Sequence, residues 1–330
     1  MSIAAIIPLY NGARFIRAAL ESVFAQTRKA DEIIVVDDGS TDDGPAVVKA
    51  MQQDHPQIVL LTQSNGGQGA ARNAGVARAR SDLIAFLDQD DVWYPHHLAE
   101  LEKRLLAPSP LPTAYAYSNL DQVDIDGRMF CHRCLDMLPP RENRRPTLID
   151  YLSRDLMILP GASLIRKSVI EEVGGFDERL RGYEDDDLFL RIFRAGYRGI
   201  YIDEPLTKWC IHPASASFDL DMARSRLIYF EKLLVQFPDE PKLWLFYISD
   251  AVAPRFFPVV LRDLASGAMY RDRPWQAVSR SFLWRLFPYL SLRQRMLGLA
   301  AVSLLSLPFA GALIEMVPRH LLRRLYRKLS

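Results

Sequence analysis

Phe86-Leu-Asp-Gln-Asp-Asp-Val-Trp93 decides the fold, because it marks both a central strand and its ligand-binding end. It overlaps an almost unbroken apolar run, Ser81-Asp-Leu-Ile-Ala-Phe-Leu87, which is typical of an interior parallel strand covered on both faces. In an extended backbone, Asp88 and Asp90 would project to the same side and share one hard cation. Acidic residues at a strand end also start turns or cap helices, so the surrounding sequence has to decide.

Strand and helix patterns alternate before this stretch. Apolar runs predict strands at residues 3–8, 32–37 and 58–62. Helical spacing predicts helices at residues 14–26 and 70–80, and a third that ends near Gln52 with Ser40 or Thr41 as its N-cap. This alternation predicts an α/β domain in which helices cover both faces of a parallel sheet.

Three of the predicted strand ends carry unusual polar groups: Tyr10-Asn11, Asp37-Asp38 and Asp88-Gln-Asp90. Ligands bind outside the carboxyl ends of the strands in open sheets of this kind. The loop Asn65-Gly-Gly-Gln-Gly69 is a fourth candidate, although glycine clusters often only turn the chain. It does not match the phosphate-cradling P-loop, and no Gly-x-Gly-x-x-Gly follows the first strand, which argues against a hydride-transfer enzyme.

The composition is that of one or two globular domains: 330 residues, 49% hydrophobic and 25% charged. The net charge of +1 hides an asymmetry, because thirteen Arg and Lys residues after Ala251 face only three acidic residues. Three cysteines do not make a disulfide framework, which favours a reducing compartment. The apolar segment before Pro8 lacks a basic region and is interpreted as a first strand, not a signal peptide.

Four motifs share one further property, their order and spacing: Ile6-Ile-Pro-Leu-Tyr-Asn11, Ile34-Val-Val-Asp-Asp-Gly-Ser-Thr-Asp42, Asn65-Gly-Gly-Gln-Gly-Ala-Ala-Arg-Asn73 and Phe86-Leu-Asp-Gln-Asp-Asp91. Together they resemble the successive motifs of family-2 glycosyltransferases, the inverting nucleotide-sugar enzymes with the GT-A fold. Gly182-Tyr-Glu-Asp-Asp-Asp-Leu188 resembles the family's Glu-Asp-x-Asp-Leu signature at a helix start. The resemblance implies a GT-A (Rossmann-like) nucleotide-sugar-binding domain with a mixed central sheet at residues 1–217.

This resemblance also implies roles for individual residues. The nucleotide-sugar-binding residues would be Pro8, Tyr10, Asn11, Asp38, Arg72 and Asp88, with Tyr10 stacking on the base and Asp38 accepting from a base N–H. Asp90 and His212 would bind the metal, Mg²⁺ or Mn²⁺. Each also has an ordinary structural explanation, since Tyr10 could be a packing residue at the strand end and Arg72 part of a solvated helix face.

Inverting sugar transfer needs a base that takes the proton of the acceptor hydroxyl as this attacks the anomeric carbon. Asp185 matches the base of the family, and crowding by the neighbouring carboxylates is expected to raise its pKa. Trp93 and Glu184 are assigned to the acceptor side. Carboxylates in a first helical turn are ordinarily there for the helix dipole, which is the structural alternative.

Tyr115–Leu120 predicts a further strand, followed by a hairpin turn at Asp126-Gly127. Cys131-His-Arg-Cys134 suggests a zinc site that Cys210 and His212 would complete. Structural zinc sites usually pair Cys-x-x-Cys with a second compact pair, and Cys-x-His is a poor one. We therefore prefer an acceptor-side loop here.

Residues 218–330 form a helical, basic C-terminal region. The uncharged run from Met296 to Ile314 is just long enough to span a bilayer, but Ser, Gly and Pro dilute it, and a buried helix pair is the structural alternative. We expect interfacial helices on an anionic membrane surface, with these aromatic residues at that surface: Trp275, Phe282, Trp284, Phe287 and Tyr289. No motif for binding nucleic acid is present.

The sequence thus predicts a metal-dependent glycosyltransferase, cytoplasmic and associated with the inner face of the cell membrane. It would transfer a sugar from a nucleotide-sugar donor, a UDP-sugar, to a glycan or lipid-linked acceptor in cell-surface polysaccharide synthesis. The alternatives are the same chemistry with a GDP- or dTDP-sugar, a non-catalytic sugar-nucleotide-binding protein, and a nucleotidyltransferase. The last would need a Lys/Arg triphosphate loop near the first strand, and Pro8-Leu-Tyr-Asn-Gly12 contains none.

Overall fold

A computed structural model of the chain describes residues 1–137, 146–212 and 220–305. The chain divides into two compact units. The first consists of Met1–Arg145 and Met157–Ser215, and the second of Pro146–Leu156 and Ala216–Ser330. The second unit thus includes a short segment that lies within residues 1–217.

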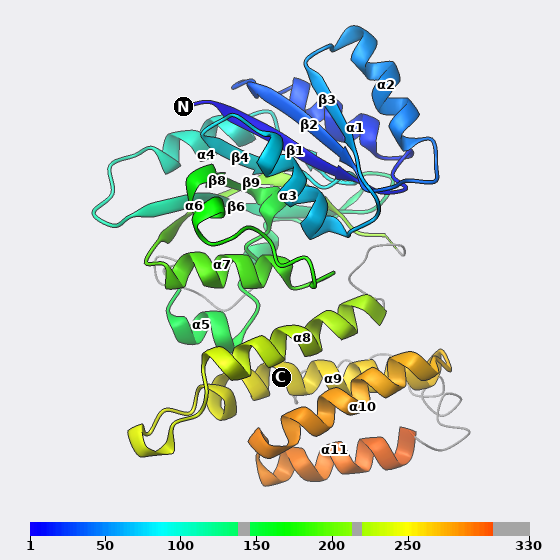
Figure 1. Ribbon diagram of the computed structural model, residues 1–330, viewed down its shortest axis with the longest axis vertical. Helices are drawn as coiled ribbons and strands as arrows, with labels where there is room; N and C mark the ends of the chain where they lie inside the picture. Colours follow the sequence, from blue (N-terminus) through cyan, green and yellow to red (C-terminus); the bar gives the residue numbers. More distant parts are fainter. Residues whose placement is uncertain (138–145, 213–219, 306–330) are drawn as a thin grey trace. The chain divides into compact units, whose positions relative to one another are not determined.

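The first unit is built on a mixed sheet (Figure 1). Its strands are β1 (Ile3–Leu9), β2 (Glu32–Asp37), β3 (Ile58–Thr62), β4 (Leu83–Phe86), β5 (Val92–Trp93), β6 (Thr113–Val123), β7 (Met129–Cys131), β8 (Ser163–Arg166) and β9 (Arg198–Cys210). In the described residues the strand order is β3-β2-β1-β4-β8-β6-β9-β5, and β7 pairs with β6. The first four strands are parallel, whereas β8 is antiparallel to both of its neighbours, β4 and β6.

The helices of this unit are α1 (Ile16–Phe24), α2 (Gly44–Asp54), α3 (Gln68–Arg78), α4 (His97–Leu105), α6 (Lys167–Glu172) and α7 (Glu184–Arg194). Alternation of strands and helices up to β4 confirms the α/β prediction. The prediction of a mixed central sheet is confirmed, because β8 breaks the parallel order next to the central strand. The predicted hairpin turn is also confirmed, since the Gly127 N–H donates to the Asp124 carbonyl at 2.9 Å.

The predicted N-cap of α2 is wrong. The helix begins after Asp43, and Ser40 and Thr41 lie outside it. Both of these residues bond to Asn11 instead: Ser40 Oγ accepts from the Asn11 N–H at 3.0 Å, and Thr41 N–H donates to Asn11 Oδ1 at 2.8 Å. A contact between two strand ends therefore uses the hydroxyls that the local pattern assigned to a helix cap.

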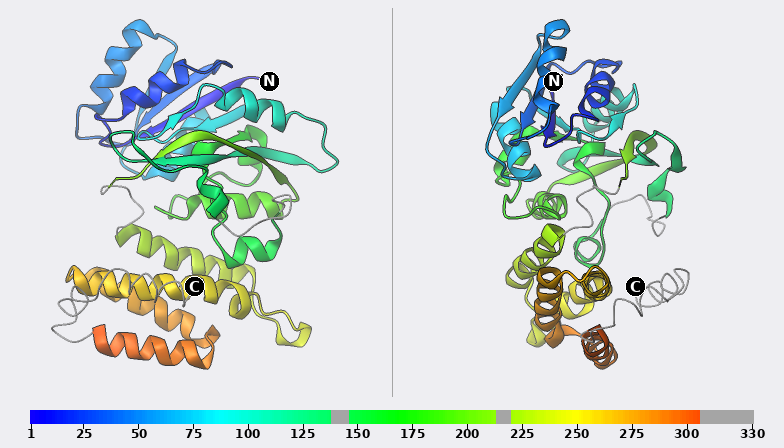
Figure 2. Two further views of the ribbon diagram at one scale, coloured as in Figure 1. Left: turned by 180° about the vertical axis from the view of Figure 1, so that it is seen from behind. Right: turned by 90° about the vertical axis from the view of Figure 1, so that its right-hand side faces the viewer.

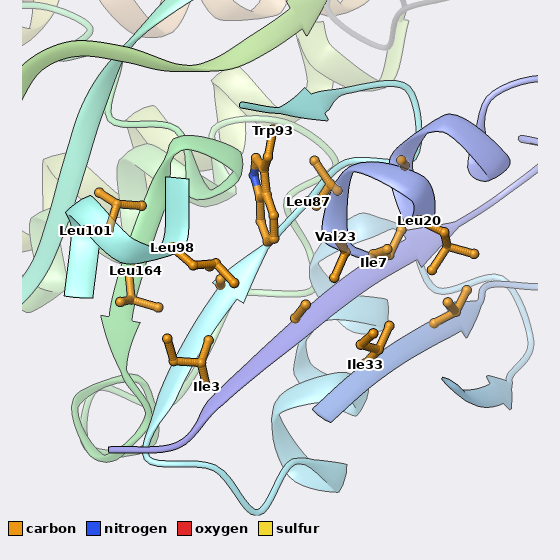
Figure 3. Packing of buried hydrophobic residues seen from close by; sticks show 14 of the residues in the cluster. Ile3, Ile7, Leu20, Val23, Ile33, Leu87, Trp93, Leu98, Leu101 and Leu164 are labelled. Carbon is orange, nitrogen blue, oxygen red and sulfur yellow. The ribbon is translucent and has the colours of Figure 1, made fainter. Parts of the chain in front are cut away.

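The hydrophobic core packs between the sheet and the helices α1 and α4 (Figure 3). Alternate residues of β1, such as Ile3 and Ile7, face Leu20 and Val23 of α1 and the leucines of α4. The opposite face of β1 is covered by α3, where Gly75 lies against Ile6. All seven residues of β1 are therefore buried, which explains why its sequence is a continuous apolar run.

The second unit is helical. It contains α5 (Leu148–Ser153), α8 (Leu220–Gln236), α9 (Ala253–Met269), α10 (Arg273–Leu286) and α11 (Leu292–Leu305). Phe230, Phe256 and Phe282 pack ring against ring in its core. The expectation that Phe282 lies at a membrane surface is therefore wrong, because its apolar ring fills the space between three helices.

None of the helices in the described ranges has the length and apolar character needed to cross a membrane. The apolar run from Met296 to Ile314 begins within α11. Its part beyond Leu305 lies outside the described residues.

We predict that Gly75→Ala lowers the free energy of unfolding, although alanine is the better helix former by about 1 kcal/mol. A Cβ at Gly75 would lie 2.4 Å from Ile6 Cγ2, and overpacking of this kind costs about 1–3 kcal/mol. Denaturant unfolding measures the difference. Gly298→Ala is the control, because its nearest neighbours are the flexible ends of Leu283 at 3.3 Å. A Gly75→Ala protein as stable as wild type would contradict the close approach of α3 to β1.

Candidate functional site

The acidic segment after β4 forms a turn. The Asp91 N–H donates to the Asp88 carbonyl at 3.0 Å, so the expectation of an extended backbone through Asp88 and Asp90 is wrong. The two carboxylates have different partners as a result. Asp88 accepts from Arg72, and Asp90 lies against His212.

Arg72 of α3 is the central cation of this site. Its Nη2 donates to Asp88 Oδ1 at 2.7 Å and its Nη1 to Glu184 Oε1 at 2.9 Å. The Arg72 side chain is only 2% exposed, and its guanidinium also lies over the rings of Phe86 and Phe176. Arg72 therefore joins the acidic turn to the first residue of α7.

This arrangement gives two predicted site residues a structural role. Arg72 was assigned to the nucleotide and Glu184 to the acceptor, and these contacts stay predictions. In the structure both side chains are buried and bonded to each other. Burial acts to lower the pKa of Arg72, and the charges of Asp88 and Glu184 outweigh it, so that this pKa is raised and the cation persists. Burial raises the pKa of Glu184, an effect that the charge of Arg72 opposes. Together the two residues join the acidic turn to the start of α7.

Asp90 and His212 form the second pair of the site. Asp90 Oδ2 lies 3.0 Å from His212 Nε2, and the imidazole stacks on the ring of Phe15 at the start of α1. Burial, and then the negative charge of Asp88, raise the pKa of Asp90, whereas the hydrogen bond with His212 acts to lower it. Asp90 and His212, which the sequence predicts as metal ligands, therefore lie in contact with each other. Phe15, whose ring supports the imidazole, was not predicted as a site residue.

Asp91 ties β9 to the same turn. Its Oδ1 accepts from the Cys210 N–H at 2.9 Å, which fixes the backbone two residues before His212. Burial, followed by the charges of Asp90 and Asp88, raises the pKa of Asp91 well above its usual range. Sequence reasoning missed this positioning contact, because β9 is remote in the chain.

Tyr10 and Asn11 follow β1. The Tyr10 side chain is exposed, with 47% of its surface accessible. Its backbone is held by Gln89, whose Oε1 accepts from the Tyr10 N–H at 2.8 Å and whose Nε2 donates to the Tyr10 carbonyl at 3.0 Å. Gln89 was not predicted as a site residue. It keeps the exposed ring next to the acidic turn.

The carboxylate of Asp38 is occupied by the glycine loop. Asp38 accepts from the N–H groups of Gly66 and Gly67 and from the Gln63 amide, each at 2.8 Å. Pro8 is buried within β1, beside Val36 of β2. The predicted contacts of Asp38 and Pro8 with the base stay predictions. In the structure Asp38 fixes the glycine loop, and Pro8 belongs to the strand that leads to Tyr10.

Asp185 stands in the first turn of α7. Two of its three acidic neighbours in that turn are buried and paired, Glu184 with Arg72 at 2.9 Å and Asp187 with Arg191 at 2.8 Å. Asp185 is partly exposed, and its Oδ1 accepts from the Asp186 N–H at 2.8 Å. Tyr183, just before the helix, has φ +63°, a left-handed conformation that is unusual for a bulky residue. This backbone sets the direction in which α7 presents Asp185.

Trp93, predicted on the acceptor side, is buried. Its side chain is 2% exposed, and its indole N–H donates to the Gly161 carbonyl at 2.9 Å. The ring stacks on His97, whose pKa burial lowers to about 3. Trp93 thus packs in the core, and its role toward an acceptor stays a prediction.

No three His, Cys, Asp or Glu side chains lie close enough to hold a metal unaided, within the part of the chain that the structure describes. The zinc alternative with Cys131 and Cys134 therefore has no ligand cluster. Asp90 and His212 do offer an oxygen and a nitrogen donor. The donor set suits a cation that takes its other ligands from a substrate phosphate and water, as Mg²⁺ commonly does.

Comparison with known proteins agrees with this geometry. The family model described as "Glycosyl transferase family 2" matches residues 4–174. An uncharacterised glycosyltransferase of Rickettsia prowazekii is 32% identical over 218 residues, which cover 65% of this chain and 65% of that protein. The matched stretches span 28% to 65% of the lengths of the first relatives found, less than two thirds in each case.

Two solved structures have a similar fold. S. aureus TarS 1–349 in complex with UDP-GlcNAc has a TM-score of 0.64 and 18% identity, covering 92% of this chain and 88% of that chain. The mannosyltransferase PcManGT from Pyrobaculum calidifontis, in complex with GDP-Man and Mn²⁺, has a TM-score of 0.57 and 18% identity, covering 99% and 82%. These similarities show the GT-A fold. Since the family model covers more than half of its length, the chain belongs to glycosyl transferase family 2.

Proposed function

We propose that the protein transfers a sugar from a UDP-sugar to a glycan or lipid-linked acceptor, with inversion at the anomeric carbon. The observation that carries this proposal is the bridge of Arg72, which joins the acidic turn to the helix of Asp185. A turn with Asp88 and Asp90 suits the diphosphate end of a donor, and a partly exposed Asp185 suits a base. A purely structural cluster would need neither the accessible part of the Asp88 carboxylate nor the partly exposed Asp185.

The donor side is formed by the ends of β1 and β4. Tyr10 offers an exposed ring on which a base can stack, and Asn11 fixes the backbone beside it through Ser40 and Thr41. Asp88 keeps part of its carboxylate accessible beside Arg72, where it could accept from a ribose hydroxyl. GDP- and dTDP-sugars are the alternative donors.

Asp90 and His212 would hold Mg²⁺ or Mn²⁺. Asp90 has a raised pKa because burial and Asp88 disfavour its negative charge, and a cation relieves that repulsion. When bound, the cation supplies charge neutralisation for a leaving diphosphate. His212, held flat against Phe15, presents its Nε2 toward Asp90.

Asp185 is the proposed base. It takes the proton of the acceptor hydroxyl while the hydroxyl oxygen forms a bond to the anomeric carbon. The bond from that carbon to the diphosphate oxygen breaks on the opposite face, so the configuration inverts. Glu184, buried one residue earlier, orients this turn of α7 through Arg72.

The helical unit would bring this chemistry to a membrane. Between Ala251 and Leu305, eight arginines face two aspartates, an excess suited to anionic headgroups. We therefore place the protein in the cytoplasm at the inner face of the cell membrane, where a lipid-linked acceptor would be accessible.

Asp90→Asn is expected to lower transfer by at least about 100-fold, because the amide loses the charge that holds the cation opposite the leaving diphosphate. Initial rates against Mn²⁺ concentration measure the effect. Asp126→Asn, on the exposed hairpin turn, is the control and should leave the rates unchanged. Near-full transfer with an unchanged metal dependence in Asp90→Asn would remove Asp90 from the metal site.

Asp185→Asn should abolish transfer while donor binding stays within about 1 kcal/mol of wild type, because only the proton acceptor is lost. Calorimetry with UDP, GDP and dTDP, each with Mn²⁺, measures binding, and UDP should bind most tightly. Asp186→Asn, the neighbour in the same helical turn, is the matched control. An equal loss of UDP affinity in Asp185→Asn would place this residue in the nucleotide site, and a wild-type protein that binds UDP-sugars without turnover would be a non-catalytic binder.

A further inference from the structure

The segment between α8 and the π-helical turn Ile248–Val252 (η6) forms a small protrusion of the helical unit (Figure 1). Glu240 and Leu245 close its base, the Glu240 N–H donating to the Leu245 carbonyl at 2.7 Å and the Leu245 N–H returning to the Glu240 carbonyl at 3.3 Å. At its end stand Leu243 and Trp244, 63% and 84% exposed. We call these two residues the Leu243–Trp244 tip.

The tip is held in a fixed shape. The Trp244 N–H donates to the Pro241 carbonyl at 3.2 Å. Behind it, the Asp239 carboxylate accepts from the Ile248 N–H at 2.7 Å and from Ser249. This scaffold anchors both ends of the protrusion to η6.

The backbone at Trp244 is left-handed, with φ +55°. Such a conformation is uncommon for residues other than glycine and is energetically unfavourable. The protein therefore accepts local strain at the position where a large apolar side chain is most exposed. A folding role does not explain this, because the Trp244 ring has little contact with the core.

A lipid bilayer fits these properties better than a protein partner. Trp has an apolar body and an N–H, and it gathers at membrane interfaces for that reason. A fluid bilayer receives a convex tip without a matching hollow, whereas a folded partner must supply one. Lys242 adds a cation next to the tip that can reach a headgroup.

The helical unit exposes further apolar side chains. Leu292, Met296 and Leu304 are exposed on α11, the helix nearest the red end of the colour scale in Figure 2. Arg293, in the first turn of this helix, is exposed and could meet an anionic headgroup.

We propose that the Leu243–Trp244 tip inserts into the interface of an anionic bilayer. This inference rests on the proposed function, because it identifies the surface through which the enzyme reaches a lipid-linked acceptor. The membrane-facing aromatic residue is then Trp244, which is exposed, and not Phe282, which is buried.

The test is co-sedimentation of the full chain with vesicles of phosphatidylcholine alone or mixed with phosphatidylglycerol. Wild type should pellet with the mixed vesicles, and Leu243→Ser/Trp244→Ser should show at least a tenfold lower partition coefficient. Tyr270→Ala is the matched control, since it removes another exposed aromatic ring of the same unit and should bind as wild type. Equal binding of the double variant and wild type would overturn the proposal.

Brominated lipids locate the indole itself. They should quench part of the tryptophan fluorescence of wild type, and Trp244→Phe should lose that part while it still pellets, because phenylalanine keeps the apolar contact. Unchanged quenching in Trp244→Phe would show that another tryptophan enters the bilayer and would overturn the proposal. So would a shift from dimer to monomer in Leu243→Ser/Trp244→Ser without vesicles, which would make the tip an interface between two copies.

Failure of this proposal can be separated from failure of the proposed function. The double variant should bind UDP with Mn²⁺ as wild type does and should transfer sugar to a water-soluble acceptor at the wild-type rate. A loss of vesicle binding with intact transfer in solution supports the tip as a docking element. A loss of UDP binding in the double variant would show that the substitutions disturb the first unit and would contradict a role confined to docking.

Discussion

The buried ion pairs of Arg72 are the interaction on which the site depends. One guanidinium holds the turn after β4 through Asp88 and the start of α7 through Glu184. These segments are almost a hundred residues apart in the chain. Removing one partner from a buried pair of this kind costs about 3–5 kcal/mol, because the remaining charge stays buried without compensation. The site therefore keeps its geometry only while all three charges are present.

This bridge leaves the site with an excess of negative charge. Arg72 serves Asp88 and Glu184, and among the described residues Asp90 and Asp91 have no guanidinium bonded to them. Burial and the charge of Asp88 raise the pKa of Asp90, and burial followed by the charges of Asp90 and Asp88 raises the pKa of Asp91. A divalent cation at Asp90 and His212 would offset that repulsion, so we expect metal binding and the shape of the acidic turn to be coupled.

The fold was largely predictable from sequence, because each early strand and helix has its own periodic signal. β1, β2 and β3 appear as apolar runs, and α1 and α3 as helical spacing between them. The antiparallel insertion of β8 has no local signal of this kind. It follows from pairing with β4 and β6, which no spacing rule reveals.

The candidate site was predictable as a set of strand ends, and less so residue by residue. Tyr10, Asp88 and Asp90 lie where the strand-end rule places them. The burial of Arg72, Glu184 and Trp93 was not predictable, because a motif carries no information on burial. Gln89 was missed, since its two hydrogen bonds to the Tyr10 backbone depend on a contact across neighbouring strands. The exposed tip at Trp244 was not predicted, because a single aromatic residue in the sequence carries no information on its exposure.

The most direct test of this account is a crystal structure of the protein with UDP and Mn²⁺. The account predicts that Arg72 stays bonded to Asp88 and Glu184, that Mn²⁺ lies between Asp90, His212 and the diphosphate, and that the uracil stacks on Tyr10. A structure in which Arg72 leaves Glu184 and binds the diphosphate would contradict it. In that case the bridge would be a resting arrangement and not the constraint that sets the site.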